Sequence, residues 1–226
     1  MSDIKTENMW LMKGDCLERM KEINDESIDL VVIDPPYGID FQSQRKKDKQ
    51  KWMPKIANDK TPFTAWLCEA HKKMKNNSCG IVFCRWDVWG EFQAQAEIAG
   101  FKVKDQLIWD KMNHGTGDLR GAPGCRHEIA MMITKGRFIF KGKRPQSVMQ
   151  IKKVSPSKLL HPNEKPVQLM EYIVNHYSAH SDVVADFTMG VSPVGIACKN
   201  LNRKFIGIEM DDKYFEIAKN RIMNND

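Results

Sequence analysis

The sequence predicts an α/β fold in which a mostly parallel, twisted sheet carries helices on both faces. Two observations predict it: short apolar runs recur along the chain, and amphipathic stretches lie between and around them. The apolar runs, each typical of a buried strand, are IDLVVI (28–33), GIVFC (80–84), HEIAMMI (127–133), DVVADF (182–187) and KFIGIEM (204–210). Because strands alternate with helices, we expect most of these strands to run parallel.

Helix start signals accompany two of the amphipathic stretches. Thr61 is a suitable N-cap with Pro62 at the first helical position, and Ser192 and Pro193 repeat this arrangement. The predicted helices cover 61–74, 88–99, 165–177, 193–201 and a last stretch from Asp211 or Asp212 to 222. The polar stretches 40–60 and 111–126 are predicted as long loops, which in a compact domain are usually functional or disordered.

Length and composition narrow the class of protein. The 226 residues suggest a single domain spanning 1–226, and 42% hydrophobic with 28% charged residues is ordinary globular composition, which excludes collagen-like or wholly disordered chains. No apolar stretch is long enough for a membrane helix, and the start MSDIKTENMW has no apolar signal region. The six cysteines include no CxxC pair, so we expect reduced thiols, no metal site and a cytoplasmic protein.

The net charge of +6 is unevenly distributed. Residues 135–158 contain eight Lys and Arg and no acid, and residues 40–60 contain seven bases and three acids, so the remainder of the chain is acidic. Two basic segments on an acidic body are typical of a surface that binds a phosphate backbone, although 40–60 is equally typical of a solvated loop. The candidate phosphate-contacting residues are Arg45, Lys46, Lys47, Lys141, Lys143 and Arg144.

The tetrapeptide Asp34-Pro35-Pro36-Tyr37 directly follows the strand 28–33, so it lies at the carboxyl end of that strand, where open α/β sheets bind ligands. Neither proline has a backbone N–H, and an ionised Asp34 only accepts hydrogen bonds. The loop therefore suits an amino group, and Tyr37 offers a flat face for a planar ring. An exocyclic amine of a nucleobase meets both demands, whereas a plain Pro-Pro turn is the structural alternative.

The second constellation runs from Asp186 to Glu209 and reads as strand, Gly-containing turn, helix and strand. Such a unit binds adenosine-containing cofactors at the carboxyl ends of its strands, and Glu209 stands 19 residues after Gly190, where an acid binds ribose hydroxyls. The turn is neither a P-loop nor a nucleophile elbow, because Ile196-Ala197 and Val194 stand at the deciding positions. By spacing alone it predicts a nucleotide-like cofactor, with a purely structural βαβ unit as the alternative.

Together these motifs resemble the amino-methyltransferases of DNA that use S-adenosylmethionine. DPPY (34–37) is similar to their catalytic tetrapeptide, and DFTMG (186–190) to their cofactor loop D-x-F-x-G-S-G. LLHPNEKPVQLMEYIV (159–174) and MKGDCLERMKEI (12–23) resemble two further family segments, and IWDK (108–111) and RHE (126–128) resemble the middle weakly. The catalytic motif precedes the cofactor motif, which is the permuted arrangement called the β class.

The resemblance implies a Rossmann-like methyltransferase fold, S-adenosylmethionine as cofactor, double-stranded DNA as partner and no metal. It implies that Asp34 and the Pro35 carbonyl bind the target amine, and that Tyr37 stacks on a base flipped out of the duplex. It also places a target-recognition region at 135–158. The residues implied at the cofactor are Asp15, His161, Lys165, Asp186, Thr188, Met189, Gly190 and Glu209. Two departures stand out: Ser192, between Val191 and Pro193, replaces the second glycine of the cofactor loop, and Asn163-Glu164 replace Thr-Gln.

Within this family, Asp at the first position of the tetrapeptide indicates N6 of adenine as the target, with N4 of cytosine as the runner-up. Two more distant hypotheses stay open at this point. A nicotinamide-dependent oxidoreductase could use the same βαβ unit, and a catalytically inactive DNA-binding relative could have kept the fold. A homodimer is also possible, since dimers are common in the class.

Overall fold

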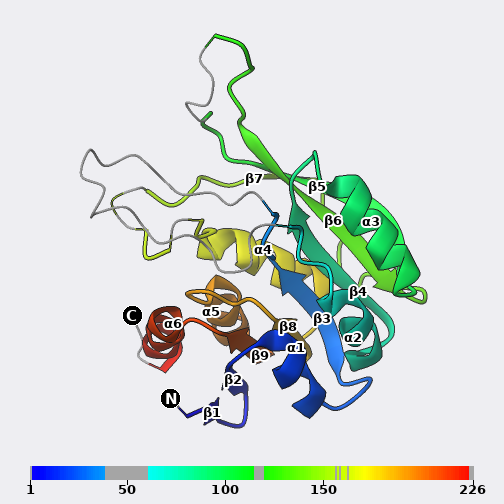
Figure 1. The fold of residues 1–226 in the computed structure, drawn as a ribbon, viewed down its shortest axis with the longest axis vertical. Helices are drawn as coiled ribbons and strands as arrows, with labels where there is room; N and C mark the ends of the chain where they lie inside the picture. The colour runs from blue at the N-terminus through cyan, green and yellow to red at the C-terminus, as the bar shows by residue number, and fades with distance from the viewer. Residues whose placement is uncertain are drawn as a thin grey trace.

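The structure is a computed structural model. It describes residues 2–38, 61–114, 120–155, 157, 159–161 and 163–223. Within these residues one sheet of nine strands forms the centre of the molecule, in the order β1-β2-β9-β8-β3-β4-β6-β5-β7 (Figure 1). The strands are β1 (Ile4–Lys5), β2 (Met9–Lys13), β3 (Ile28–Ile33), β4 (Met74–Cys84), β5 (Lys102–Asp110), β6 (His127–Lys135), β7 (Val148–Gln150), β8 (Val183–Asp186) and β9 (Lys204–Glu209).

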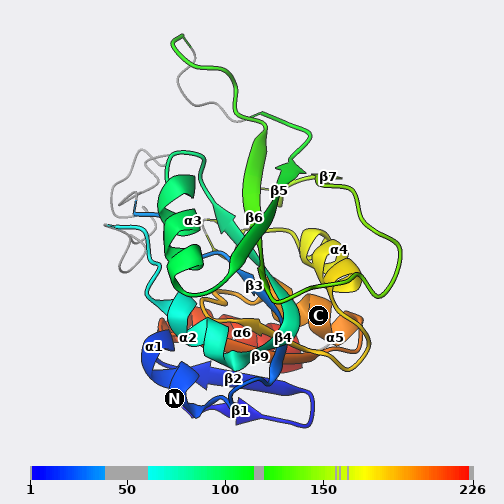
Figure 2. The same ribbon diagram turned by 90° about the vertical axis from the view of Figure 1, so that its right-hand side faces the viewer.

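The helices pack on the two faces of this sheet (Figure 2). They are α1 (Cys16–Arg19) with the short 3₁₀ helix Met20–Glu22, α2 (Trp66–Lys73), α3 (Trp89–Ile98), α4 (Val167–Tyr177), α5 (Pro193–Asn200) and α6 (Asp212–Met223). Buried side chains of α1, α2 and α3 pack on one face, and those of α4, α5 and α6 pack on the other. The predicted α/β architecture with helices on both faces is confirmed.

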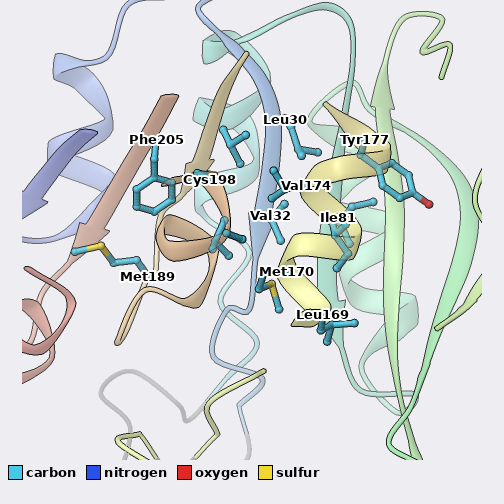
Figure 3. Packing of buried hydrophobic residues seen from close by; sticks show 14 of the residues in the cluster. Leu30, Val32, Ile81, Leu169, Met170, Val174, Tyr177, Met189, Cys198 and Phe205 are labelled. Carbon is cyan, nitrogen blue, oxygen red and sulfur yellow. The ribbon is translucent and has the colours of Figure 1, made fainter. Parts of the chain in front are cut away.

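Strand β3 shows how the two cores share one sheet. Its apolar residues alternate, so Leu30 and Val32 enter the core under α4, while Val31 and Ile33 enter the core under α2. In Figure 3, Leu30 and Val32 lie beside Val174 and Met170 of α4. Burial on both faces explains why the sequence 28–33 is apolar throughout, with only Asp29 as an exception.

The sheet is mostly but not entirely parallel. Strands β2, β9, β8, β3 and β4 run parallel, whereas β6 pairs antiparallel with both β4 and β5. A strand that follows its neighbour without a crossover helix must return in the opposite direction, and β6 follows β5 through residues 111–126. The described parts of this connection extend away from the body of the molecule beyond the carboxyl end of β5 (Figures 1 and 2).

One predicted helix start is wrong. Helix α2 begins at Trp66 and its N-cap position is Ala65, rather than Thr61. Pro62 instead pairs with Tyr37 in an isolated bridge, and the Phe63 amide donates to the Pro36 carbonyl at 3.0 Å. The segment 61–63 therefore returns to the tetrapeptide 34–37 before the helix begins, so tertiary pairing overrides the local capping signal.

Gly195 allows α5 to approach the sheet closely. A Cβ atom built there would lie 2.4 Å from the Ser192 hydroxyl, 2.7 Å from Ile222 and 2.8 Å from the Phe205 ring. These contacts are far inside van der Waals separation, and two of them involve fully packed core side chains. The glycine is therefore required by packing, although it lies in a helix.

We predict that Gly195→Ala lowers the free energy of unfolding by about 1 kcal/mol or more, because overpacking outweighs the gain of about 1 kcal/mol in helix propensity. Gly90→Ala in α3 is the matched control, since a Cβ there meets nothing within 4 Å. Chemical denaturation of both variants measures the difference. Equal stabilisation by the two substitutions would contradict the packing argument.

Candidate active site

The carboxyl ends of three parallel neighbours, β3, β8 and β9, meet at one edge of the sheet. Strand β3 leads into Asp34, β8 ends at Asp186 and β9 ends at Glu209. A pocket opens at this edge, and its walls include residues from each of these strand ends. All twelve residues that the sequence singled out for catalysis or cofactor binding line it: Asp15, Asp34, Pro35, Pro36, Tyr37, His161, Lys165, Asp186, Thr188, Met189, Gly190 and Glu209.

The tetrapeptide 34–37 is held in place by its neighbours. The Thr188 hydroxyl donates to the Asp34 carbonyl at 3.3 Å, which ties the tetrapeptide to the loop after β8. The Asp34 carboxylate itself is already engaged: the Tyr37 hydroxyl donates to one oxygen and the Lys165 ammonium to the other. Burial raises the pKa of Tyr37 well above its ordinary value, and the charges of Asp34 and Glu128 add to this, so its hydroxyl stays a donor. The sequence predicted the acceptors of this loop but not the donors that occupy them.

The loop after β8 wraps around the end of β9. The carboxylate of Glu209 accepts from the Gly190 amide at 2.8 Å and from the Asp211 amide at 2.7 Å, one on each oxygen. Because each carboxylate oxygen has two lone pairs, Glu209 keeps acceptor sites for a ligand. The Met189 amide also donates to the Ile208 carbonyl at 2.9 Å, which fixes the loop along β9.

Ser192, the departure from the family loop, adopts a backbone conformation that favours glycine. Its φ is 57°, in the left-handed region, and its hydroxyl is buried without a hydrogen-bond partner in the described part of the chain. Its amide still donates to the Met189 carbonyl at 2.7 Å, so the turn closes as a glycine would close it. Serine is accommodated here at the cost of backbone strain and an unsatisfied hydroxyl.

Burial governs the charge state of the two strand-end acids. Asp186 is 4% exposed, and burial raises its pKa to about 8, opposed by the Thr188 amide that donates to it. Burial also raises the pKa of Glu209, opposed by the amides of Asp211 and Gly190. The pocket therefore holds carboxyl groups that a positively charged ligand would help to ionise.

Asp15 reaches the pocket from the end of β2, which is the parallel neighbour of β9. It is also the N-cap of α1, where its carboxylate accepts from the Leu17 amide at 2.8 Å. The Gly14 amide donates to the Glu209 carbonyl at 3.0 Å, so this turn is fixed to the end of β9. Asp15 therefore both caps α1 and lines the pocket.

Helix α6 fixes the HPNEKP segment over the pocket. Glu164 forms an ion pair with Arg221 at 2.8 Å and has a 4% exposed side chain, while the His161 ring packs edge-on against Tyr214 with centroids 4.5 Å apart. Arg221 also donates to the Val191 carbonyl at 2.8 Å, which joins α6 to the loop after β8. Burial lowers the pKa of His161, so its ring is neutral near pH 7.

Sequence reasoning missed Tyr214, Arg221 and Glu164 as residues that shape this site. Tyr214 and Arg221 lie two helical turns apart on one face of α6, which is the signal that could have identified them. Glu164 was noted only as a departure from the family segment. Its partner Arg221 gives that departure a physical reason, because a carboxylate binds a guanidinium more strongly than an amide does.

The predicted phosphate-contacting residues are placed unevenly. Lys141 is 61% exposed but forms an ion pair with Asp182 at 3.0 Å, just before β8 begins and so at the sheet edge opposite the pocket. Lys143 and Arg144 are exposed on the chain that leads to β7, and Arg45, Lys46 and Lys47 lie outside the described residues. Lys152 and Lys153, by contrast, are exposed just after β7, whose carboxyl end lies at the same edge as the pocket.

Other chemistry is sparse in the described part of the chain. No group of three or more His, Cys, Asp and Glu side chains there could hold a metal ion. All six cysteines are free, and burial raises the pKa of Cys84 beside the pocket to about 12. No helix among the described residues is long and apolar enough to span a bilayer.

The chain is similar to several known DNA methyltransferases. The type II methyltransferase M.HinfI of Haemophilus influenzae is 27% identical over 249 residues, which cover 94% of this chain and 67% of that protein. M.HpaI of Haemophilus parainfluenzae is 25% identical over 237 residues, which cover 94% of this chain and 73% of that protein.

Solved structures show the same fold. The M1.HpyAVI–SAM complex superimposes with a TM-score of 0.72 at 25% identity, covering 94% of this chain and 99% of that chain. The cytosine-N4-specific PvuII DNA methyltransferase has a TM-score of 0.73 at 20% identity, covering 98% of this chain and 89% of that chain. The fold is thus the Rossmann-like fold of methyltransferases.

The family follows from the sequence match. A family model described as DNA methylase, which covers N6 and N4 methyltransferases, matches residues 28–220 and so includes both the catalytic tetrapeptide and the loop after β8. This match overrides the oxidoreductase hypothesis, which left the tetrapeptide unexplained. The chain belongs to the N6/N4 DNA methylase family and is a DNA methyltransferase.

Proposed function

We propose that the protein transfers a methyl group from S-adenosylmethionine to the exocyclic N6 amine of an adenine flipped out of double-stranded DNA. The observation that carries this proposal is the meeting of two loops at one pocket. The acceptor-rich tetrapeptide from Asp34 to Tyr37 lines the same pocket as the loop after β8 and the buried carboxyl groups of Asp186 and Glu209.

The residues of the pocket fit this cofactor. S-Adenosylmethionine supplies an electrophilic methyl group on a sulfonium and carries a positive charge. Asp186 and Glu209 are buried acids with raised pKa values, and a cation beside them would offset the desolvation that holds those values high. The unused lone pairs of Glu209 suit the ribose hydroxyls, and Asp15 at the end of β2 suits the adenine.

The tetrapeptide would make the target amine nucleophilic. The lone pair of an aromatic amine is delocalised into the ring, so the nitrogen reacts only when it becomes pyramidal. Asp34 and the Pro35 carbonyl would each accept a hydrogen bond from one N–H of the amine in a fixed geometry. This favours the pyramidal nitrogen and aims its lone pair at the methyl group. The nitrogen–methyl bond would form as the sulfur–methyl bond breaks, the sulfur would keep that bond's electron pair as a neutral thioether, and the methylated amine would release one proton to solvent. The remainder of the rate enhancement is proximity, with no covalent enzyme intermediate.

The target base must leave the duplex to reach Asp34, because Asp34 lines a pocket and a base inside a duplex is stacked and paired. Tyr37, which lines the same pocket, is suited to stack on the flipped base. Double-stranded DNA would then lie across the carboxyl edge of the sheet, near Lys152 and Lys153 and the connection between β5 and β6.

N4 of cytosine is the second candidate target, since the same acceptors suit any exocyclic amine of a base. Asp at position 34 favours adenine, whereas the fold is shared with a cytosine-N4-specific enzyme. The experiment incubates the protein with duplex DNA and methyl-labelled S-adenosylmethionine and identifies the labelled nucleoside. We expect N6-methyladenine. Labelled N4-methylcytosine would instead support the second candidate target, and the absence of label in the DNA would contradict both candidates.

We predict that Asp34→Asn lowers turnover at least about tenfold, because an interaction worth more than about 1.4 kcal/mol in the transition state is lost. Cofactor affinity measured by calorimetry should stay close to that of the wild type. Asp25→Asn is the control, because the Asp25 carboxylate is likewise paired with a lysine, Lys73 at 2.7 Å, and does not line the pocket. A fully active Asp34→Asn enzyme would remove Asp34 from the catalytic role.

We predict that Asp186→Asn stabilises the fold while weakening cofactor binding. The pKa of Asp186 is about 8 when folded and near 3.8 when unfolded, so the folded protein holds a proton that the unfolded chain releases, and stability falls as pH rises between these values. Asp186→Asn does not lose stability in this way as pH rises. Its free energy of unfolding should exceed that of the wild type by more than about 1 kcal/mol near pH 9, and by less near pH 5.

Asp110→Asn provides a control of opposite sign for this pH series, because the hydrogen bond from Arg126 lowers the pKa of Asp110 to about 2. Its substitution should cost stability at neutral pH rather than add it. Denaturation of the three proteins across pH measures the effect. A wild type whose stability tracks that of Asp186→Asn at every pH would show that Asp186 is ionised in the folded state.

We predict that replacing Lys152 and Lys153 with Ala weakens DNA binding and reduces the slope of log K against log salt by roughly 0.9 for each lost phosphate contact. Lys141→Ala serves as the control, because that side chain is paired with Asp182 at the opposite sheet edge. DNA titrations over a salt series measure both. A larger effect of Lys141→Ala would mean that DNA approaches from the other edge.

A further inference from the structure

Lys165 places a buried ammonium group directly beside the catalytic tetrapeptide. Its side chain is 5% exposed, it donates to one carboxylate oxygen of Asp34, and it lies 3.5 Å from a carboxylate oxygen of Glu128. The ammonium also lies over the Phe83 ring, 4.6 Å from its centroid. The Lys165 ammonium is thus held between two carboxylates and an aromatic face.

The charges around Lys165 balance one another. Burial alone would lower the pKa of Lys165, but the carboxylates of Asp34 and Glu128 raise it above its ordinary value. Burial alone would raise the pKa of Glu128, but the ammonium groups of Lys165 and Lys111 hold it below its ordinary value. Both groups therefore stay charged. Removing Glu128 would leave the buried Lys165 ammonium with less negative charge to balance it, and removing Lys165 would leave Glu128, whose side chain is 37% exposed, with Lys111 as its partner.

The two oxygens of Asp34 have unequal donors. Lys165 holds Oδ2 with a buried, charged donor, whereas Tyr37 holds Oδ1 with a neutral hydroxyl from the next turn of the same loop. Both bonds have an ionised acceptor, but the Lys165 bond joins two opposite charges, so it gains a Coulomb attraction that the Tyr37 bond lacks. When the target amine enters, the Tyr37 hydroxyl is the donor that exchanges, and Lys165 keeps its hold on Oδ2.

We propose that Lys165, held by Glu128, is a positioning residue that fixes the Asp34 carboxylate so that Oδ1 faces the amine that is methylated. This inference rests on the proposed function and deepens it. It differs from the role that the family resemblance implies for Lys165, which is contact with the cofactor. It also gives a role to the RHE and IWDK segments. Glu128 of the first segment pairs with Lys165, and Lys111 of the second lies 3.4 Å from Glu128.

The test compares Lys165→Met, Lys165→Arg and Glu128→Gln at saturating DNA and S-adenosylmethionine, with rates normalised to the bound cofactor. We expect Lys165→Met to lower turnover at least about tenfold, with cofactor affinity within about threefold of the wild type. Lys165→Arg should retain more turnover than Lys165→Met, and Glu128→Gln should lose less turnover than Lys165→Met. Lys73→Met is the matched control, because Lys73 is also a buried, paired lysine, 2.7 Å from Asp25, and lies outside the pocket.

A second measurement separates positioning from a merely structural role. If Lys165 acts through Asp34, Lys165→Met should cost little further turnover in the Asp34→Asn background, so the two losses should not add. Additive losses, unchanged turnover, or a loss that excess cofactor restores would each overturn the inference. Should Lys165→Met fail to fold, Lys165→Arg and Glu128→Gln give the same comparison. A wild type that methylates no DNA would instead contradict the proposed function.

Discussion

The pairing of β3 with β8 is the constraint on which the rest of the site depends. Leu30 pairs with Val184 and Val31 with Ala185, so two strands far apart in the sequence run parallel as neighbours. The Val183 amide also donates to the Asp29 carboxylate at 2.9 Å, which anchors the start of β8 against β3. Because parallel neighbours end at the same edge, this pairing alone brings the tetrapeptide after β3 beside the loop after β8.

The same convergence brings acidic groups together, two of which, Asp186 and Glu209, are buried. Asp34, Asp186 and Glu209 meet in one pocket, and their proximity adds to the burial that raises the pKa of Asp186. Lys165 is the cation that offsets part of this charge. A positively charged ligand would therefore stabilise the folded protein. Without such a ligand the buried acids lower its stability, as is common at functional sites.

Much of the site follows from sequence because its residues sit at strand ends. The apolar run 28–33 and the runs before Asp186 and Glu209 set the strand boundaries, so the convergence of these acids is predictable from the rule for parallel sheets. The sequence does not predict strand β5 because Lys102, Lys104, Asp105 and Gln106 are exposed and break the apolar pattern. The antiparallel direction of β6 was missed because direction depends on the connection, and the connection carries no helical signal.

The side-chain contacts between segments far apart in the sequence could not be predicted. Lys165 was assigned to the cofactor because its motif precedes the cofactor loop, yet its contact with Asp34 arises only when α4 packs on β3. Lys141 belongs to a strongly basic segment, but its partner Asp182 comes from another part of the chain. Thr61 has the local signal of an N-cap, and its neighbours pair with the tetrapeptide instead. In each case the surroundings of the side chain depend on a long-range contact that the local sequence does not reveal.

The most direct measurement is a crystal structure of the protein with bound S-adenosylmethionine. The account predicts that the ribose lies against Glu209, that the sulfonium lies beside Asp186, and that the methyl group faces Asp34 and the Pro35 carbonyl with room for one planar base between them. A cofactor bound with its methyl group turned away from Asp34, or with its ribose against the tetrapeptide, would contradict the claim that the β3–β8 pairing joins the two halves of one methyl-transfer site.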